Sequence, residues 1–137
     1  MNQYQNVHYL SSLRIAAYLE QFKDVTLGEK VLEIGKGAGV AGILKRKIAS
    51  EYKTLDIDDS LCPDIVADIT SFESMKQLQN YFDAIYCCQV LERIPYDQSL
   101  KAIEKFFKLA AKKVVLSLPN NRRPIKFKFQ IPKFKWH

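Results

Sequence analysis

The residues best suited to chemistry in this chain are glycines that gather in one short stretch. Four of the five glycines lie within eight residues, at Gly35, Gly37, Gly39 and Gly42, directly after the apolar run 31–34. Glycine at a turn between a strand and a helix lets ligand atoms approach the backbone closely, and the free amides at a helix start favour polar or anionic groups. The stretch predicts a binding site for a nucleotide-like ligand.

Two motifs fit these glycines. The first is E-x-G-x-G-x-G, from Glu33 to Gly39, and the second is the dinucleotide fingerprint G-x-G-x-x-G, from Gly37 to Gly42. In a dinucleotide-binding fold the first glycine of the fingerprint closes the strand, whereas Gly37 comes three residues after Ile34. The position of Gly37 relative to the end of the strand therefore favours the first motif. Asp56, about 20 residues downstream, suits both, because a carboxylate there accepts hydrogen bonds from ribose hydroxyls.

The elements that must hold these residues alternate between strand and helix. A helix over His8 to Phe22 leads into the sheet, and Leu100, Ile103, Phe107 and Ala110 mark one face of a later helix. The other segments are strands at 30–34, 52–56, 64–67, 82–88 and 113–118, and helices at 40–48 and 72–80. This alternation predicts five parallel strands covered by helices.

Four segments, in this order and at these strand ends, resemble the class I S-adenosylmethionine-dependent methyltransferase family, with a methyltransferase type 11-like domain. They are VLEIGKGAG, TLDID, IVADIT and FDAIYCCQVLERIP, within residues 28–119. The resemblance implies an α/β, Rossmann-like open parallel sheet with helices on both faces. It also implies methyl transfer from S-adenosylmethionine to a small-molecule oxygen or nitrogen. Residues 1–137 are expected to form one such domain, with a basic aromatic tail at 120–137.

The resemblance also implies roles for single residues. Gly35, Lys36, Gly37 and Gly39 would form the loop beneath the methionine part of the cofactor, and Glu33 would support this loop and the ammonium end. The remaining cofactor-binding residues follow the second, third and fourth strands: Asp56 for the ribose hydroxyls, Ile57 for the adenine face, Asp68 for the adenine amine, Ile69 as a backbone donor to the ring, and Gln89 beside the methyl-bearing end.

Each of these residues also has a purely structural interpretation. Asp56 and Asp68 could cap helices or turns, Glu33 could pair with Lys36, and Ile57 could belong to the core. Position at the carboxyl ends of parallel strands, where ligands bind in open sheets, favours the functional interpretation of the two aspartates. Asp58, Asp59 and Asp64 are expected to be solvated turn acids.

The chain departs from the family pattern in two ways. Leu91-Glu92-Arg93 stands where the family often has Leu-Glu-His, and His8 and His137 lie near the ends of the chain, so we assign no catalytic base. The family also adds two further strands, the last antiparallel, and the complete pair is not expected here. These departures keep open a truncated, non-catalytic cofactor-binding or interaction module. An NAD-dependent oxidoreductase stays open through the second glycine motif alone.

The positive charge is concentrated in the tail. Residues 1–119 hold 15 basic and 15 acidic residues, while residues 120–137 hold six basic residues and no acid, which accounts for the net charge of +6. Alternation from Ile125 to Ile131 predicts an edge strand beside the fifth strand after the NNRRP turn. The alternative is a contact with nucleic acid or an anionic membrane, and an uncovered edge could support an oligomer.

Composition limits the remaining classes of function. With 137 residues, 47% of them hydrophobic, the chain can bury one continuous core. The start MNQYQNVHYL lacks the pattern of a secretory signal, and no apolar stretch approaches the roughly 20 residues that span a bilayer, so we expect a cytoplasmic protein. Cys62, Cys87 and Cys88 lack metal-ligand spacing and are expected to be reduced core thiols; no metal is expected.

Overall fold

The computed structural model describes residues 12–36, 39–71, 73–118 and 125–130. The expected helix start at 8–11, Gly37, both histidines and residues 131–137 lie outside this part of the chain. The elements in chain order are α1 (Ser12–Phe22), β1 (Lys30–Ile34), α2 (Val40–Ile48), β2 (Glu51–Asp56), η3 (Asp59–Leu61), β3 (Ile65–Val66), η4 (Glu73–Leu78), β4 (Ala84–Cys88), η5 (Leu91–Arg93), α3 (Tyr96–Leu109), β5 (Lys113–Leu118) and β6 (Ile125–Gln130), where η denotes a 3₁₀ helix.

The strands form one six-stranded sheet in the order β3-β2-β1-β4-β5-β6. The first five strands are parallel, and β6 runs antiparallel to β5, with Leu118 opposite Ile125 and Lys113 opposite Gln130. The predicted parallel sheet and the predicted edge strand are therefore both confirmed. One antiparallel strand covers the edge of β5.

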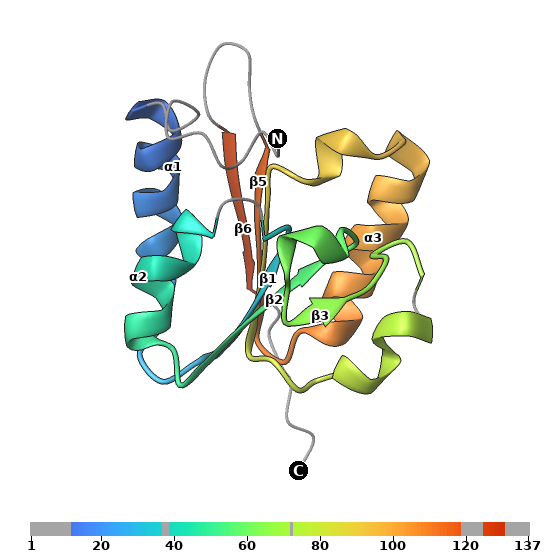
Figure 1. Ribbon diagram of the computed structural model, residues 1–137, viewed down its shortest axis with the longest axis horizontal. Helices are drawn as coiled ribbons and strands as arrows, with labels where there is room; N and C mark the ends of the chain where they lie inside the picture. The colour runs from blue at the N-terminus through green and yellow to red at the C-terminus, as the bar shows by residue number, and fades with distance from the viewer. Residues whose placement is uncertain (1–11, 37–38, 72, 119–124, 131–137) are drawn as a thin grey trace.

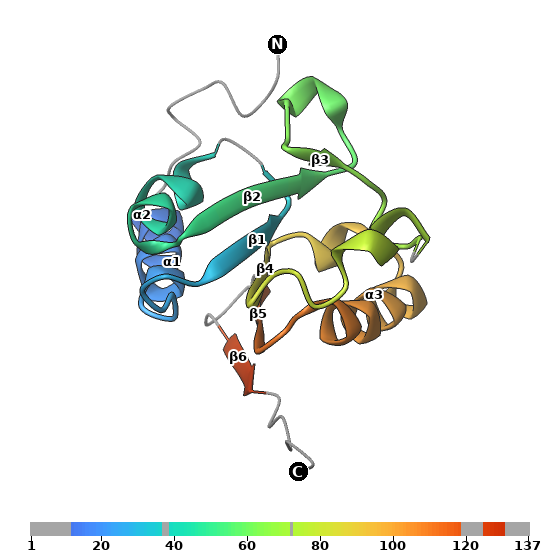
Figure 2. The same ribbon diagram turned by 90° about the horizontal axis from the view of Figure 1, so that it is seen from below.

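Helices cover both faces of the sheet, as Figure 1 shows and Figure 2 repeats from below. Helices α1 and α2 lie on one side, and α3 with the 3₁₀ turns lies on the other. Because side chains alternate along a strand, each central strand contributes to both layers. In β1, Val31 packs on the side of α1 and α2, while Leu32 and Ile34 belong to the larger core beneath α3. This two-sided burial explains why the strands read as continuous apolar runs.

Two helical expectations need correction. Over 72–80 the described residues form the 3₁₀ helix η4, held by the fully buried Met75, instead of an α-helix. Asn80, at φ +58°, ends this segment and donates its N–H to the carbonyl oxygen of Leu109 at 2.8 Å. A 3₁₀ helix, with hydrogen bonds between residues three apart, is common in such short connecting segments.

The buried face of α3 is rotated from the predicted one. Its buried residues are Ser99, Ala102, Phe106 and Leu109. Of the predicted face, Ala110 is buried at the C-cap, whereas Leu100 is 46% exposed. Ile103 and Phe107 flank the buried face and pack against the core as partly buried side chains. Apolar residues on two adjacent stripes made the sequence pattern broader than the face that touches the sheet. No helix in the described part of the chain is long and apolar enough to cross a membrane.

Candidate functional site

The strand order reverses between β1 and β4, and this reversal places the candidate site. From β1 the chain passes to β2 and β3 on one side, while β4 and β5 lie on the other. Open α/β sheets bind ligands outside the carboxyl ends of the strands at such a point. Here the carboxyl ends of β1, β2 and β4 bring together Gly35, Asp56 and Gln89.

The glycine turn begins with a residue that must be glycine. Gly35 has φ +82°, a Cβ there would lie 2.3 Å from Cγ2 of Val90, and its N–H donates to the carbonyl oxygen of Leu55 at 2.8 Å. The turn ends at Gly39, which is the N-cap of α2 at φ +74° and donates to the carbonyl oxygen of Lys36 at 3.0 Å. The backbone of β1 and the segment after β4 thus approach each other more closely than any larger residue would allow.

The Asp56 carboxylate is fixed by two backbone amides. Its Oδ2 accepts the N–H of Lys36 at 2.9 Å, and its Oδ1 accepts the N–H of Asp58 at 3.0 Å. Each ionised oxygen can accept more than one hydrogen bond, so both keep capacity for ligand hydroxyls. Ile57 is 68% exposed, so its alternative assignment to the core is wrong. A preorganised acceptor therefore stands next to an exposed apolar side chain.

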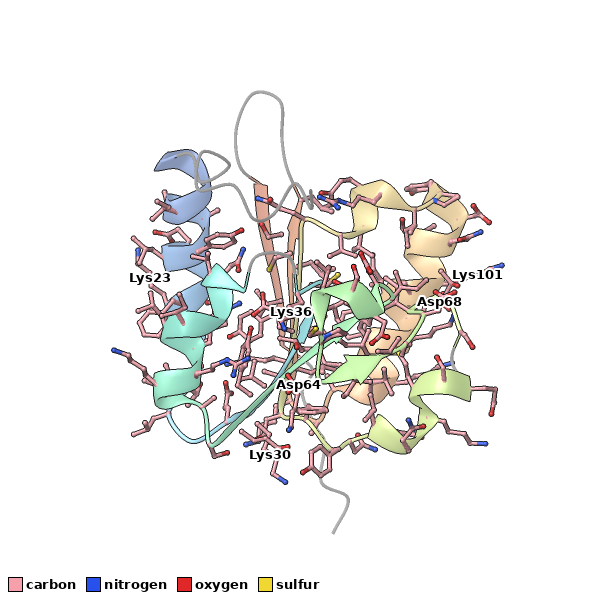
Figure 3. All side chains as sticks on the ribbon, viewed as in Figure 1. Lys23, Lys30, Lys36, Asp64, Asp68 and Lys101 are labelled. Atoms are coloured by element: carbon pink, nitrogen blue, oxygen red, sulfur yellow. The ribbon has the colours of Figure 1, made fainter. Side chains whose placement is uncertain are left out.

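Lys36 uses both of its nitrogens to tie the turn to the segment after β2. Its backbone amide bonds Asp56, and its ammonium donates to the carbonyl oxygen of Cys62, just after η3. Figure 3 shows Lys36 between the sheet and the short green helical turn. Asp58 in turn caps η3 by accepting the Ser60 N–H at 3.0 Å. These bonds hold the 56–62 segment beside the glycine turn.

Asp68 caps a local turn, as its structural interpretation predicted. Its Oδ1 accepts the Thr70 N–H at 2.8 Å and the Thr70 hydroxyl at 2.7 Å. The Thr70 hydroxyl and amide hold the pKa of Asp68 below its ordinary value, and Lys105 contributes to the shift. Lys105 reaches from α3 to the carbonyl oxygen of Thr70. The side chain of Ile69 is buried, so only its backbone could face a ligand, and the cofactor roles of both residues stay predictions.

Gln89 occupies an unusual backbone conformation directly after β4. Its φ is +58°, in the left-handed region that non-glycine residues rarely adopt, and its N–H donates to the carbonyl oxygen of Ser117 at 2.8 Å. The side chain is half-buried. Strained residues of this kind concentrate at functional sites, because the surrounding structure must hold them in place. The place of Gln89 beside the methyl-bearing end of the cofactor stays a prediction.

Glu33 lies in a different environment from the other site residues. Its carboxylate accepts the Lys45 ammonium at 2.7 Å and the Tyr52 hydroxyl at 2.8 Å, and it is almost completely buried. The suggested pair with Lys36 is wrong, because Lys36 bonds Cys62 instead. Sequence reasoning missed Lys45, although helical periodicity places it on the buried face of 40–48, where a lysine needs a counter-charge.

The three aspartates that were expected to be solvated turn acids divide into two kinds. Asp58 and Asp59 are exposed turn acids, as expected. Asp64 is exposed too, but its Oδ2 accepts both the amide and the hydroxyl of Thr54, at 2.8 and 2.9 Å, and so joins β2 to the start of β3. Burial alone would raise the pKa of Asp64, yet the two Thr54 bonds outweigh it and lower that pKa. Asp64 is therefore a structural acid.

The cysteines differ from their prediction in one position. None of the three is in a disulfide bond; Cys87 is buried and Cys88 half-buried, whereas Cys62 is exposed and at φ +50°. The expectation of a core thiol is therefore wrong for Cys62, because it ends η3 at the surface. Among the described residues, no three His, Cys, Asp or Glu side chains cluster closely enough to hold a metal ion.

Solved structures with this fold include methyltransferases. The N-methyltransferase NodS from Bradyrhizobium japonicum WM9, in complex with S-adenosyl-L-homocysteine, has a TM-score of 0.66 and 17% identity, over 78% of this chain and 62% of that one. A SAM-dependent methyltransferase from Archaeoglobus fulgidus has a TM-score of 0.63 and 18% identity, over 88% and 57%. A putative Zn-dependent alcohol dehydrogenase from Rhodobacter sphaeroides has a TM-score of 0.65 and 19% identity, over 79% and 46%.

These similarities confirm the Rossmann-like fold. The chain spans about half to six-tenths of the length of the three structures (46%, 57% and 62%). No family model matches the sequence, so the type 11 assignment stays a prediction.

Proposed function

We propose that this chain binds S-adenosylmethionine at the carboxyl ends of β1, β2 and β4 and transfers its methyl group to a small-molecule acceptor. The observation that carries the proposal is the Asp56 carboxylate, which the amides of Lys36 and Asp58 fix beside the exposed Ile57. A nucleoside needs such a pair, with acceptors for the ribose hydroxyls and an apolar surface for the base.

The residues around Asp56 fit the rest of the cofactor. Gly35 turns the backbone at the end of β1, and a Cβ at Gly39, the N-cap of α2, would meet nothing within 4 Å, so polar groups of a ligand can approach main-chain atoms at that end of the turn. Asp68 and the backbone of Ile69 would face the adenine edge, and Gln89 would lie beside the methyl-bearing end. These assignments come from the resemblance of the motifs and from the position of each residue at a strand end.

S-adenosylmethionine, when bound, supplies an electrophilic methyl group on a sulfonium. The chain's own residues would then bind and orient the two reactants and exclude water, which is where the rate gain of an in-line displacement arises. The described residues include no histidine, and we assign no general base. A general base is needed only if the acceptor must lose a proton.

Two other functions compete with this proposal. An NAD-dependent oxidoreductase would use the second glycine motif, and one solved structure of similar fold carries a dehydrogenase name. However, β1 ends at Ile34 and Gly35 follows at once, so Gly37 does not close the strand as that motif requires. The other rival is a cofactor-binding module without turnover, which Leu91-Glu92-Arg93 keeps open because it stands where the family often has Leu-Glu-His.

The test is a calorimetric titration of the whole chain with S-adenosylhomocysteine, with NAD as the competing ligand. We expect micromolar binding of the first and none of the second. The site variant is Asp56→Asn, which keeps the size of the side chain but turns one acceptor into a donor; it should lose about tenfold or more in affinity. The matched control is Asp59→Asn, an exposed aspartate in the adjacent η3, which should bind within about twofold of wild type.

The possible results separate the rival functions. Preferential binding of NAD would replace the methyltransferase proposal with the oxidoreductase. A folded wild type that binds neither ligand would contradict the proposed site altogether. If S-adenosylhomocysteine binds, incubation with S-adenosylmethionine carrying a labelled methyl group and a panel of small amines and phenols distinguishes the enzyme from the non-catalytic module.

A further inference from the structure

A lysine lies fully buried next to the glycine turn. The Lys45 side chain has no exposed surface, and its ammonium lies 2.7 Å from Oε2 of Glu33, whose side chain is 5% exposed. The same ammonium donates to Oε1 of Gln21 at 3.3 Å and stands 4.4 Å from the ring centroid of Tyr86. Desolvation of two opposite charges is tolerated only where they pair closely and their remaining groups find partners.

The pair connects the elements that hold the candidate site. Glu33 is on β1, two residues before Gly35, and Lys45 is on α2, which begins directly after Gly39. Tyr52 adds β2, because its hydroxyl donates to the same Glu33 oxygen at 2.8 Å. These three elements carry both ends of the glycine turn and the Asp56 carboxylate. A displacement of the pair would therefore displace the turn.

Gly42 makes this contact possible. A Cβ on Gly42 would lie 2.6 Å from the Tyr52 hydroxyl oxygen, so only glycine lets the tyrosine lie under α2. Burial, and then the Glu33 carboxylate, raise the pKa of Tyr52 well above its ordinary value, so its hydroxyl stays a donor. The glycine that completed the second sequence motif thus serves the packing of α2 on β2.

The charge of Glu33 is compensated on the helix side of the sheet. Its side chain shares with Val31 the face that α1 and α2 cover. A ligand ammonium would have to compete with Lys45 for this carboxylate across the strand. Breaking one side of a buried pair leaves an uncompensated charge, which is strongly unfavourable.

We propose that Lys45 is a positioning residue: it neutralises the buried Glu33 carboxylate beneath α2, so that an uncompensated charge does not displace the two ends of the glycine turn, and Glu33 does not contact the bound cofactor. The statement about the turn stands on the free protein. The statement about the cofactor rests on the proposed function, and the two are tested separately.

The chain contains a matched control for a purely stabilising pair. Lys113 and Glu29 lie 2.9 Å apart, with side chains 8% and 6% exposed. Lys113 begins β5 and Glu29 directly precedes β1, so this pair is at the amino ends of the strands, opposite the candidate site. Its loss should destabilise the fold in the same way but leave the glycine turn as it is.

The first measurement is hydrogen exchange of the Gly35 and Lys36 amides, which bond Leu55 and Asp56, in the protein without ligand. At matched global stability, set with denaturant, Lys45→Met should exchange about tenfold faster at these two amides than Lys113→Met. The double variant Glu33→Gln/Lys45→Met removes both charges, and its exchange rate at these amides should return to within about threefold of wild type.

Equal exchange in the two single variants would overturn the positioning role. If Lys45→Met does not fold, Glu33→Gln breaks the same pair from its other side and is compared instead with Glu29→Gln, which breaks the control pair; equal exchange in these two variants would again overturn the role.

The second measurement is binding of S-adenosylhomocysteine. Lys45→Met should lose about tenfold or more in affinity, whereas the double variant and Lys113→Met should stay within about threefold of wild type. A double variant that regains slow exchange but still binds about tenfold more weakly would mean that Glu33 contacts the cofactor, which contradicts the inference. A wild type that does not bind S-adenosylhomocysteine would contradict the proposed function, while the exchange experiment would still decide the role of Lys45.

Discussion

The backbone amide of Lys36 donates to the Asp56 carboxylate at 2.9 Å, across two neighbouring parallel strands. Pairing of Ile34 with Leu55 sets the register that brings the ends of these strands level. The same aspartate accepts the N–H of Asp58, so one carboxylate satisfies amides on both segments. The residue expected to receive ribose hydroxyls therefore also holds the site together before any ligand arrives.

Replacement of Asp56 by alanine should lower stability as well as affinity. The change leaves the partly buried Lys36 amide and the exposed Asp58 amide without their acceptor, which we expect to cost about 1–3 kcal/mol in the free energy of unfolding, mostly through Lys36. Asp59→Ala, a few residues away and exposed, should change it by less than about 0.5 kcal/mol. Urea denaturation of the two variants without ligand measures the difference. Equal stabilities would mean that the two amide bonds contribute little.

Gly35→Ala should be among the most damaging single-methyl additions in the chain. The new Cβ meets Val90 at 2.3 Å, and the residue would have to keep a φ of +82°. Overpacking and the left-handed conformation together should cost about 2–5 kcal/mol, seen as a lower midpoint of thermal unfolding. Gly28→Ala is the control, because Gly28 has φ +81° but open space around it, and it should cost only about 1–2 kcal/mol.

The packing part of this cost can be removed separately. In Gly35→Ala/Val90→Ala the clashing Cγ2 is gone. The double variant should therefore lose about 1–2 kcal/mol less in the free energy of unfolding than the two single variants lose together. Additive effects would show that the backbone conformation alone forbids alanine at this position.

Asp83 should contribute to the acid sensitivity of the fold. Its carboxylate accepts the Lys30 N–H at 2.9 Å and lies 3.0 Å from the Lys112 ammonium. Burial would raise the pKa of Asp83, but the Lys30 and Lys112 bonds outweigh it and lower that pKa. A group with a lowered pKa in the folded state adds stability above its unfolded pKa of about 4, and this stability is lost as the pH falls through the folded pKa.

Asp83→Asn should therefore be less stable than wild type at neutral pH and lose less stability on acidification below about pH 4. Denaturation curves between neutral and acidic pH measure both effects, with Asp59→Asn as the exposed control. An acid limb as steep as that of wild type would show that other carboxylates determine it.

The fold was largely predictable because the central strands are buried on both faces. The run Val31–Ile34 faces one core with Val31 and the other with Leu32 and Ile34, so every position is apolar except Glu33. Such runs, separated by helical patterns, allow few topologies. The edge strand was predictable from its alternation. Residues 72–80 were not, because a six-residue 3₁₀ segment anchored by Met75 has the same apolar spacing as a short α-helix.

The site was predictable where the backbone determines it and less so where side chains compete. Asp56 ends β2 and Gln89 follows β4, and parallel strands bring those ends to one edge whatever the side chains do. The partner of Glu33 depended on which charged residue reaches the covered face of β1. Lys36 is closer in sequence, but Lys45 lies on the buried face of α2, and because its side chain has no exposed surface it requires a counter-charge.

Gln89→Gly should separate stability from ligand binding. Glycine adopts φ +58° without strain, so the free protein should gain about 0.5–1 kcal/mol, while loss of the side chain beside the proposed methyl site should weaken binding of S-adenosylhomocysteine by about threefold or more. Asn80→Gly is the control, because Asn80 also has φ +58° but lies just after η4, away from the site. This variant should gain less stability, since asparagine tolerates the conformation, and it should bind S-adenosylhomocysteine as wild type does. Thermal unfolding and calorimetry measure the two quantities. A less stable Gln89→Gly would mean that packing of the glutamine side chain outweighs the strain of its backbone, and the left-handed conformation would then be no sign of a ligand site.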